Sequence, residues 1–215
     1  MTAPPAWRAS TQRLRGFAQL WADVRGDQLL AVMVDWDRPV APALAELLAS
    51  AARGAAGEGA AGFPRRLIGA LYERLVTAEA ARAIDGVSVA AVATGARGTA
   101  VAWVGDVRAQ VESAGEVWSS RDHTLGNLTA REGVVLGDDS RELAKRTVAK
   151  MVGRVGALEI EEQTIASSPI RRVALCTGEM HGYGELDIPS WTLEARPATF
   201  PVDDLFEAAL FEPAR

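Results

Sequence analysis

Cysteine and histidine are scarce in the sequence, with one cysteine and two histidines among 215 residues. The single cysteine, Cys176, excludes a disulfide within the chain and fits a reducing compartment. A basic excess is also absent, since the formal net charge is −5 and the isoelectric point is near 5.2. Nothing electrostatic therefore favours binding to nucleic acid or to an anionic membrane surface.

Long apolar segments are lacking too. The longest solidly apolar run covers residues 29–34, and the start of the chain, MTAPPAWRAS, has neither the basic nor the apolar region of a secretion signal. We therefore expect no membrane span and a cytoplasmic protein. Because 48% of the residues are hydrophobic, a chain of this length can bury one sizeable core, which predicts a single domain over residues 1–215.

Strand-like segments dominate the middle of the sequence. Residues 99–104 and 107–111 are apolar runs separated by Gly105-Asp106, and a third run begins at Glu116. Glycine tolerates positive φ and aspartate hydrogen-bonds its own backbone, so this step is typical of a hairpin. The spacing predicts a meander of three strands.

Helical spacing lies on both sides of this region. Residues 40–52 and 64–83 place apolar residues at helical spacing, on one face of a helix in each case, whereas the Gly/Ala-rich residues 53–62 predict a loop. Asp139 and Glu142 form a capping-box pattern for a third helix. Its expected buried face consists of Leu143, Thr147 and Met151, with Ala144 and Val148.

The order of elements predicts an α+β fold. Residues 7–24 are interpreted as a hairpin that leads into the strand 29–34, and residues 125–137 as an irregular polar rim. Further strands are expected at 87–94, 157–163, 171–176, 190–195 and 204–211, with a fourth helix near 180–186. Strands and helices therefore come in groups instead of alternating as βαβ units.

One ordered set of motifs resembles a known family. The run VGDVRA (residues 104–109), a hairpin, and then Arg121-Asp122-His123 resemble the centre of the metal-dependent PP2C-type serine/threonine phosphatases, which carry a V-G-D-S-R-A-like strand pair followed by an L-x-x-D-H step. The resemblance implies a four-layer α/β/β/α sandwich of two antiparallel sheets flanked by helices. It also implies carboxylates that hold two Mn or Mg ions, which activate a water for attack on phosphorus.

Two of the four ligand places of that family hold an acid here. In VMVDWDRP, Asp35 stands at the bridging aspartate of the family's D-G-M-G-G-H turn, while Trp36 takes the glycine position. In PVDDLF, Asp204, or Asp203 as its alternate, stands at the closing D-D or D-N step. Two acids that cap a strand end would give the same pattern.

The other two places lack their acid. Gly178 stands where the late S-D-G turn has its aspartate, and Glu179 is the neighbouring candidate ligand. Phe17 stands where the first hairpin has its N-x-D-A acid, and Asp23 lies six residues away, roughly 20 Å along a strand. No residue is assigned a catalytic role. We expect no metal cofactor, or Mn or Mg if a residual site binds one.

Trp36 has two interpretations. An exposed Trp36, with Asp37 and Arg38, would form a contact surface for a protein partner in place of a substrate cleft. A buried Trp36 would instead fill the emptied metal pocket. His123 is interpreted as a residue that caps a turn, because only His181 could join it in acid–base chemistry.

Three functions follow from these observations. The first is a PP2C-like pseudophosphatase that acts as a binding or regulatory module for a phosphoprotein, a kinase or a phosphatase. The alternative is a weakly active metal-dependent phosphoserine/phosphothreonine protein phosphatase that uses Asp35, Glu179 and Asp204. The third is an N-terminal nucleophile hydrolase that uses Thr2 after loss of Met1. It is disfavoured because Ala3-Pro4-Pro5 is typical of a loose tail.

Overall fold

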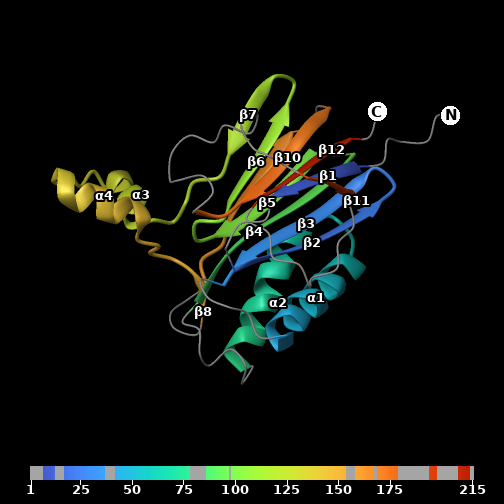
Figure 1. The fold of residues 1–215 in the computed structure, drawn as a ribbon, viewed down its shortest axis with the longest axis horizontal. Helices are drawn as coiled ribbons and strands as arrows, with labels where there is room; N and C mark the ends of the chain where they lie inside the picture. Colours follow the sequence, from blue (N-terminus) through green and yellow to red (C-terminus); the bar gives the residue numbers. More distant parts are fainter. Residues whose placement is uncertain are drawn as a thin grey trace.

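The strands of the protein form two antiparallel sheets that pack face to face (Figure 1). The computed structural model describes residues 7–12, 17–36, 42–77, 86–96, 98–153, 158–166, 169–178, 194–197 and 208–213. With helices flanking the sheets, this architecture confirms the expected α+β class of two antiparallel sheets flanked by helices.

The first sheet has the strand order β11-β1-β12-β10-β6-β7. Its members come from both ends and the middle of the chain. They are β1 (Trp7–Gln12), β6 (Arg108–Ser113), β7 (Glu116–Ser119), β10 (Ile170–Cys176), β11 (Glu194–Pro197) and β12 (Ala208–Pro213).

The second sheet has the order β2-β3-β4-β5-β9, and the short β8 (Val152–Gly153) pairs with β4. The five strands are β2 (Ala18–Arg25), β3 (Gln28–Asp35), β4 (Gly86–Gly95), β5 (Gly98–Val104) and β9 (Glu161–Ala166). Strand β3 is apolar on both faces because Leu29 and Met33 point to the first sheet while Leu30 and Val34 point to the helices.

Helices α1 (Pro42–Gly57) and α2 (Phe63–Thr77) cover the outer face of the second sheet (Figure 1). The loop expected at residues 53–62 is wrong in its first part, because α1 continues to Gly57. Ala55 and Ala56 are buried there, and alanine is the best helix former. Burial of small side chains thus extends a helix through a segment whose glycines indicated a loop.

Helices α3 (Leu125–Arg131) and α4 (Asp138–Arg146) project from the side of the sandwich (Figure 1). We call residues 125–147 the helical arm. The irregular rim expected at residues 125–137 is wrong for α3, which Thr124 caps by accepting a hydrogen bond from the Asn127 amide. The third expected helix exists, but Leu143 and Met151 are exposed and Ala144 is its buried residue.

Two expected hairpins are wrong because the chain changes sheets. Strands β1 and β2 belong to different sheets, so residues 7–24 do not form a hairpin; the hairpin is β2–β3. Likewise β5 lies in the second sheet and β6 in the first, so Gly105-Asp106 carries the chain across the sandwich. Only β6 and β7 of the expected meander pair with each other.

None of the helices in the described part of the chain combines the length and the apolarity that crossing a bilayer requires.

Candidate functional site

One end of the sandwich collects the motifs that the sequence singled out. Asp35, the last residue of β3, lies opposite Ser88 of β4. The Ser88 hydroxyl accepts a hydrogen bond of 3.2 Å from the Asp106 amide, which lies in the connection between β5 and β6. In the first sheet, Cys176 at the end of β10 pairs with Arg108 at the start of β6. The ends of strands from both sheets and the connection between β5 and β6 therefore meet at this end of the sandwich.

Gly105 makes the crossing possible. Its φ is +95°, and a Cβ added to it would lie 2.2 Å from the Ser88 hydroxyl oxygen. Both the left-handed backbone and the lack of space exclude a side chain at this position. The glycine that suggested a hairpin thus allows two strands of different sheets to be joined by a tight connection.

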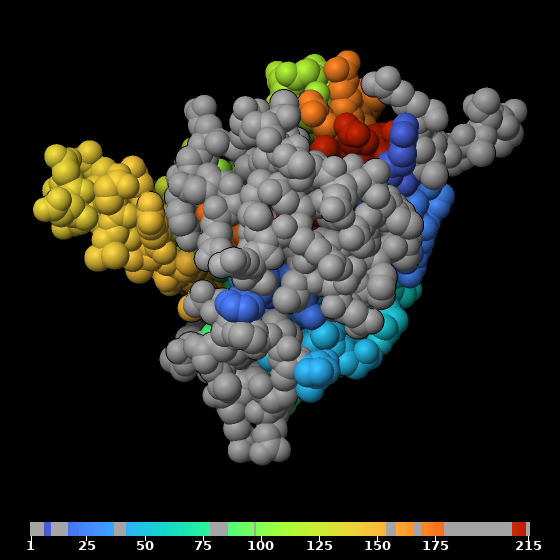
Figure 2. Space-filling model, in the orientation of Figure 1, coloured from blue at the N-terminus to red at the C-terminus, as the bar shows by residue number. Residues whose placement is uncertain are grey.

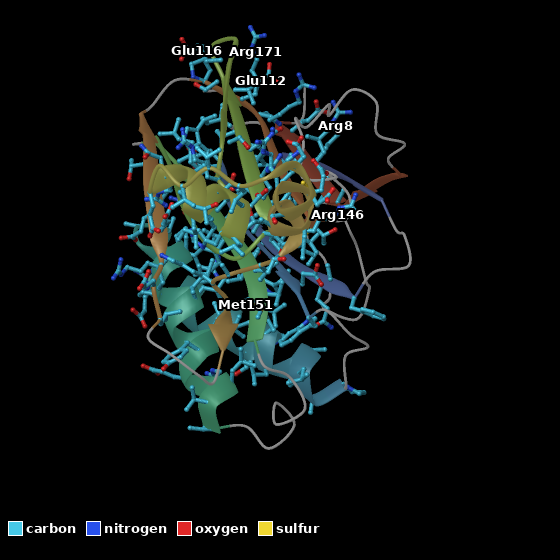
Figure 3. The ribbon with its side chains drawn as sticks, turned by 90° about the vertical axis from the view of Figure 1, so that its left-hand side faces the viewer. Arg8, Glu112, Glu116, Arg146, Met151 and Arg171 are labelled. Atoms are coloured by element: carbon cyan, nitrogen blue, oxygen red, sulfur yellow. The ribbon has the colours of Figure 1, made fainter. Side chains whose placement is uncertain are left out.

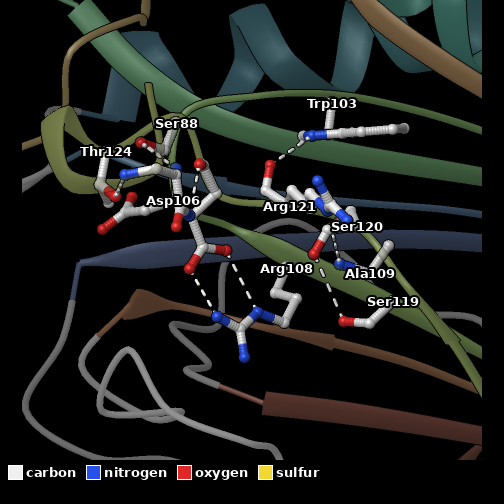
Figure 4. Close-up of polar contacts among 11 residues, drawn as sticks. Ser88, Trp103, Asp106, Arg108, Ala109, Ser119, Ser120, Arg121 and Thr124 are labelled. Atoms are coloured by element: carbon white, nitrogen blue, oxygen red, sulfur yellow. Dashed lines mark hydrogen bonds and ion pairs between the residues drawn. The ribbon is translucent and has the colours of Figure 1, made fainter. Parts of the chain in front are cut away.

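Arg108 and Asp122 form a buried ion pair next to this connection (Figure 4). Arg108 Nε donates to Asp122 Oδ1 at 3.1 Å and Nη2 donates to Oδ2 at 2.5 Å, a bidentate geometry. The side-chain Nδ2 of Asn127 donates to the backbone carbonyl of Asp122, which connects the ion pair to α3. Burial raises the pKa of the neighbouring Cys176 thiol, so this cysteine stays protonated and is no nucleophile.

A cavity of about 380 Å³ opens beside the ion pair. Its wall combines Arg108, Ser120, Arg121, Asp122, Asn127, Ala130 and Arg131. The positive charges of Arg108 and Arg131 are paired with Asp122 and with Glu161, respectively. The cavity therefore has less positive charge available than its three arginines suggest.

His123 is buried and holds the Gly105 connection from the other side. The Gly105 amide donates to His123 Nδ1 at 3.1 Å, and the His123 amide donates to the Gly105 carbonyl at 2.8 Å. Because Nδ1 accepts, the neutral ring carries its proton on Nε2, which lies 3.3 Å from Glu161 Oε1 without a well-directed hydrogen bond. The acceptor nitrogen is thus occupied, and His123 is not arranged as a general base or a metal ligand. This contact supports the interpretation of His123 as a residue that caps a turn.

Burial lowers the pKa of His123, aided by Lys150 and Arg131 and opposed by Glu161. The unfolded chain therefore binds a proton at His123 more readily than the folded chain does. Its contribution to stability is present above the ordinary pKa of about 6.5 and is lost as the pH falls below it. We expect the urea midpoint to fall between about pH 7.5 and 5.5.

A single variant tests this prediction. His123→Gln should flatten the pH dependence of the urea midpoint in that range, because it removes the group that titrates there. Burial raises the pKa of Glu161, but the hydrogen bond from Arg131 and the charges of His123 and Arg131 outweigh it, so this pKa is lowered overall and does not interfere in that pH range. An equal slope in His123→Gln and in the unchanged protein would contradict the assignment.

Trp36 is buried, with 1% of its surface exposed. Its indole Nε1 donates to Gln19 Oε1 of β2 at 2.8 Å, and its ring belongs to the core between the second sheet and the helices. The expectation that Trp36 forms an exposed contact surface is therefore wrong, because the ring is buried under α1 and α2. The interpretation that it fills an emptied metal pocket stays a prediction. Gln19, a polar residue inside an apolar strand, is the partner that sequence reasoning missed.

Phe17 lies beside this tryptophan. Ala18 of β2 pairs with Asp35 of β3, and Phe17 and Trp36 are the next residues beyond this pair. Phe17 packs against the core that contains Trp36. Asp23 pairs with Leu30 near the other end of the hairpin and accepts a hydrogen bond from Arg25. As expected from its distance along the strand, Asp23 cannot replace an acid at position 17.

The remaining candidate ligands lie in part outside the described residues. Gly178 is described and buried, directly beyond the end of β10. Glu179, Asp203, Asp204, Asp37, Arg38 and His181 lie outside the described residues. Ala208, the first residue of β12, pairs with Cys176, so the segment that carries Asp203 and Asp204 enters β12 at the same end of the sandwich.

The described side chains at this end do not fit a pair of hard cations. Such ions take oxygen ligands, mainly carboxylates and carbonyls. Phe17 and Gly178 offer no side-chain oxygen, and the Trp36 indole, in the residue after Asp35, lies in the apolar core. Within the described ranges, no three histidine, cysteine, aspartate or glutamate side chains gather as a metal site would require.

Comparisons with known proteins support the fold and nothing finer. No protein-family model matches the sequence, and no curated protein matches it. Among solved structures, the fold is that of PP2C-type serine/threonine phosphatase domains.

Three of these structures illustrate the similarity. The catalytic domain of the serine/threonine phosphatase PstP, solved with two manganese ions, is 11% identical with a TM-score of 0.63, over 98% of this chain and 99% of that chain. PppA, described as a key regulatory component of the type VI secretion system in Pseudomonas aeruginosa, is 15% identical with a TM-score of 0.63, over 99% and 100%. A stage II sporulation E family protein from Thermanaerovibrio acidaminovorans is 20% identical with a TM-score of 0.57, over 75% and 81%.

Proposed function

We propose that the protein is a PP2C-like pseudophosphatase, a cytoplasmic single-domain binding or regulatory module without phosphatase activity. The observation that carries this proposal is the apolar packing at the end of the β2–β3 hairpin. Phe17 and Trp36 join the hydrophobic core where the resemblance implies an acid and a glycine turn. A side chain that packs in this way cannot also bring an oxygen to a metal ion.

The packing also fixes the Trp36 side chain. Its indole donates a hydrogen bond to Gln19 inside the core, so loss of the indole removes a buried polar contact. Trp36, the residue after Asp35, is therefore held by the core. A rigid scaffold of this kind suits recognition of a protein partner, whether a phosphoprotein, a kinase or a phosphatase. Asp37 and Arg38 remain the proposed contact residues.

Asp35 favours the second candidate function, a weakly active metal-dependent phosphoserine/phosphothreonine protein phosphatase. It keeps its position at the end of β3, and the start of β12 lies at the same end of the sandwich. In this alternative Asp35, Glu179 and Asp204 would hold a Mn or Mg ion, with Asp203 as the alternate to Asp204.

The response to manganese separates the two functions. A site with a dissociation constant near 1 mM, in about 10 mM manganese, would stabilise the fold by about 1.4 kcal/mol. For a chain of this length that is roughly 3 to 6 °C in melting temperature. We expect a shift below about 1 °C, since two carboxylates fall short of a hard-cation site. We also expect p-nitrophenyl phosphate hydrolysis at the background rate.

Two asparagine variants control this measurement. Asp35→Asn removes the candidate ligand, and Asp27→Asn removes an exposed carboxylate at the opposite turn of the same hairpin. A rise of several degrees with manganese that disappears in Asp35→Asn and persists in Asp27→Asn would overturn the pseudophosphatase and favour the phosphatase. Glu179→Gln would then test the replacement ligand.

A further inference from the structure

The helical arm and its base carry most of the large apolar side chains that are exposed in the described part of the chain. Of the seven large hydrophobic residues that are exposed in the described part of the chain, five lie in the arm or next to its base. Val135 is 89% exposed and Leu143 is 71% exposed. Apolar side chains gathered in this way mark a contact surface more often than single exposed ones do. The five are Leu125, Val134, Val135, Leu143 and Met151.

The arm is attached to the body at its base and through α3, whose Arg131 forms an ion pair with Glu161 of β9. Hydrogen bonds join the Leu125 amide to the Thr147 carbonyl and the Ala149 amide to the His123 carbonyl, which closes the arm at its base. Beyond this base, α3 buries no residue and α4 buries only Ala144. The space-filling view shows the arm standing out from the body (Figure 2). The face of α4 opposite Ala144 is therefore available.

That face carries an acid, a leucine and a base in order. Asp139, Leu143 and Arg146 are spaced at i, i+4 and i+7, which places them on one stripe of α4. Ala144, which packs close to Gly126 of α3, lies on a different side of the helix. Arg146 is visible on the arm, which points toward the viewer in Figure 3.

The stripe is complementary to itself. If two copies of α4 lie antiparallel, Asp139 of one copy faces Arg146 of the other, and the midpoint between these positions falls beside Leu143. A two-fold axis at that midpoint pairs Asp139 with Arg146 twice and brings the two Leu143 side chains together. Contacts of this kind define an isologous interface, in which the same patch is used by both copies.

We propose that the helical arm is a homodimerisation surface, in which α4 pairs antiparallel with α4 of a second copy. The interface is centred on Leu143 and has Asp139–Arg146 pairs on both sides. A helix of nine residues is about 13 Å long, so the area buried falls below that of a stable dimer, and association is weaker than about 1 µM. The proposal is independent of whether the chain hydrolyses phosphate.

Charge reversal in two variants tests the pairing. Asp139→Lys makes both ends of the stripe basic, and Arg146→Glu makes both ends acidic. Each variant alone places like charges opposite each other twice and should stay monomeric in sedimentation velocity between about 10 µM and 1 mM, where the unchanged protein dimerises. An equimolar mixture restores opposite charges at both contacts and should dimerise again.

The controls separate pairing from effects on the helix itself. Acids at the start and bases at the end of a helix also stabilise it, so both variants are compared by circular dichroism. If the charges only stabilise the helix, the equimolar mixture forms no more dimer than the separate variants do, and the proposal is overturned. Leu143→Asp should abolish association, while Val117→Asp, a matched change at an exposed residue of β7, should not. An unchanged protein that stays monomeric up to about 1 mM also overturns it.

Discussion

Replacement of Trp36 by alanine should lower the free energy of unfolding by about 3 kcal/mol or more, which is the range for deletion of a buried aromatic side chain. The ring is 1% exposed and packs in the core between the second sheet and α1 and α2. The substitution removes those contacts and also leaves the buried Gln19 side chain without its indole partner. The urea midpoint and the slope of the transition measure the change.

Two further variants divide this loss into its parts. Trp36→Phe keeps much of the apolar volume and removes the indole N–H, so its cost should be about 1 to 3 kcal/mol, the range for loss of a buried hydrogen-bond partner, here the donor to Gln19 Oε1. Val117→Ala, at an exposed position of β7, should stay within about 0.5 kcal/mol. A change of similar size in Trp36→Ala and Val117→Ala would show that the Trp36 ring does not stabilise the core.

The side chain that follows Asp35 is part of the core. The resemblance implies glycine at this position, where a backbone can approach an ion closely. Here Trp36 instead enters the core, and Phe17 packs beside it. Both residues that stand at ligand places of the resembling family therefore take part in the packing of the core.

The sheet strands could be predicted from the sequence because their signal is local. Residues 29–34 and 87–94 are apolar runs bounded by polar or glycine residues, and both lie inside observed strands. Helices α1, α2 and α4 were also indicated by spacing, although α1 extends further than expected and α3 was not anticipated. The spacing of apolar residues indicates which side chains of a segment are buried, and this spacing differs between a strand and a helix.

The assignment of strands to sheets could not be predicted in the same way. Gly105-Asp106 is typical of a hairpin, yet the structure holds it with Ser88 and His123, which come from distant parts of the chain. The position of Trp36 likewise depends on Gln19 in the neighbouring strand. His123 has Glu161 as a neighbour, and no spacing in the sequence indicates this contact. Such contacts follow from the fold and not from any local pattern.

The second large effect concerns the buried ion pair. Arg108→Met should lower the free energy of unfolding by about 3 to 5 kcal/mol, because it leaves the Asp122 carboxylate buried without its bidentate partner. The Arg108 and Asp122 side chains are 11% and 3% exposed, so water cannot replace the lost contact fully. Asp122→Leu should cost a similar amount, since it removes the bidentate carboxylate partner of the buried Arg108 guanidinium.

The double variant Arg108→Met with Asp122→Leu should be more stable than either single variant. Replacement of both members of a buried pair by apolar side chains removes both desolvation penalties, and such changes are often near neutral. The exposed pair Arg65–Glu162, at 2.6 Å and with 59% and 46% of the side chains exposed, is the matched control. Arg65→Met should cost under about 1 kcal/mol. If the free-energy changes of the two single variants simply add in the double variant, Arg108 and Asp122 are not energetically coupled. The ion pair then does not stabilise the fold as a pair.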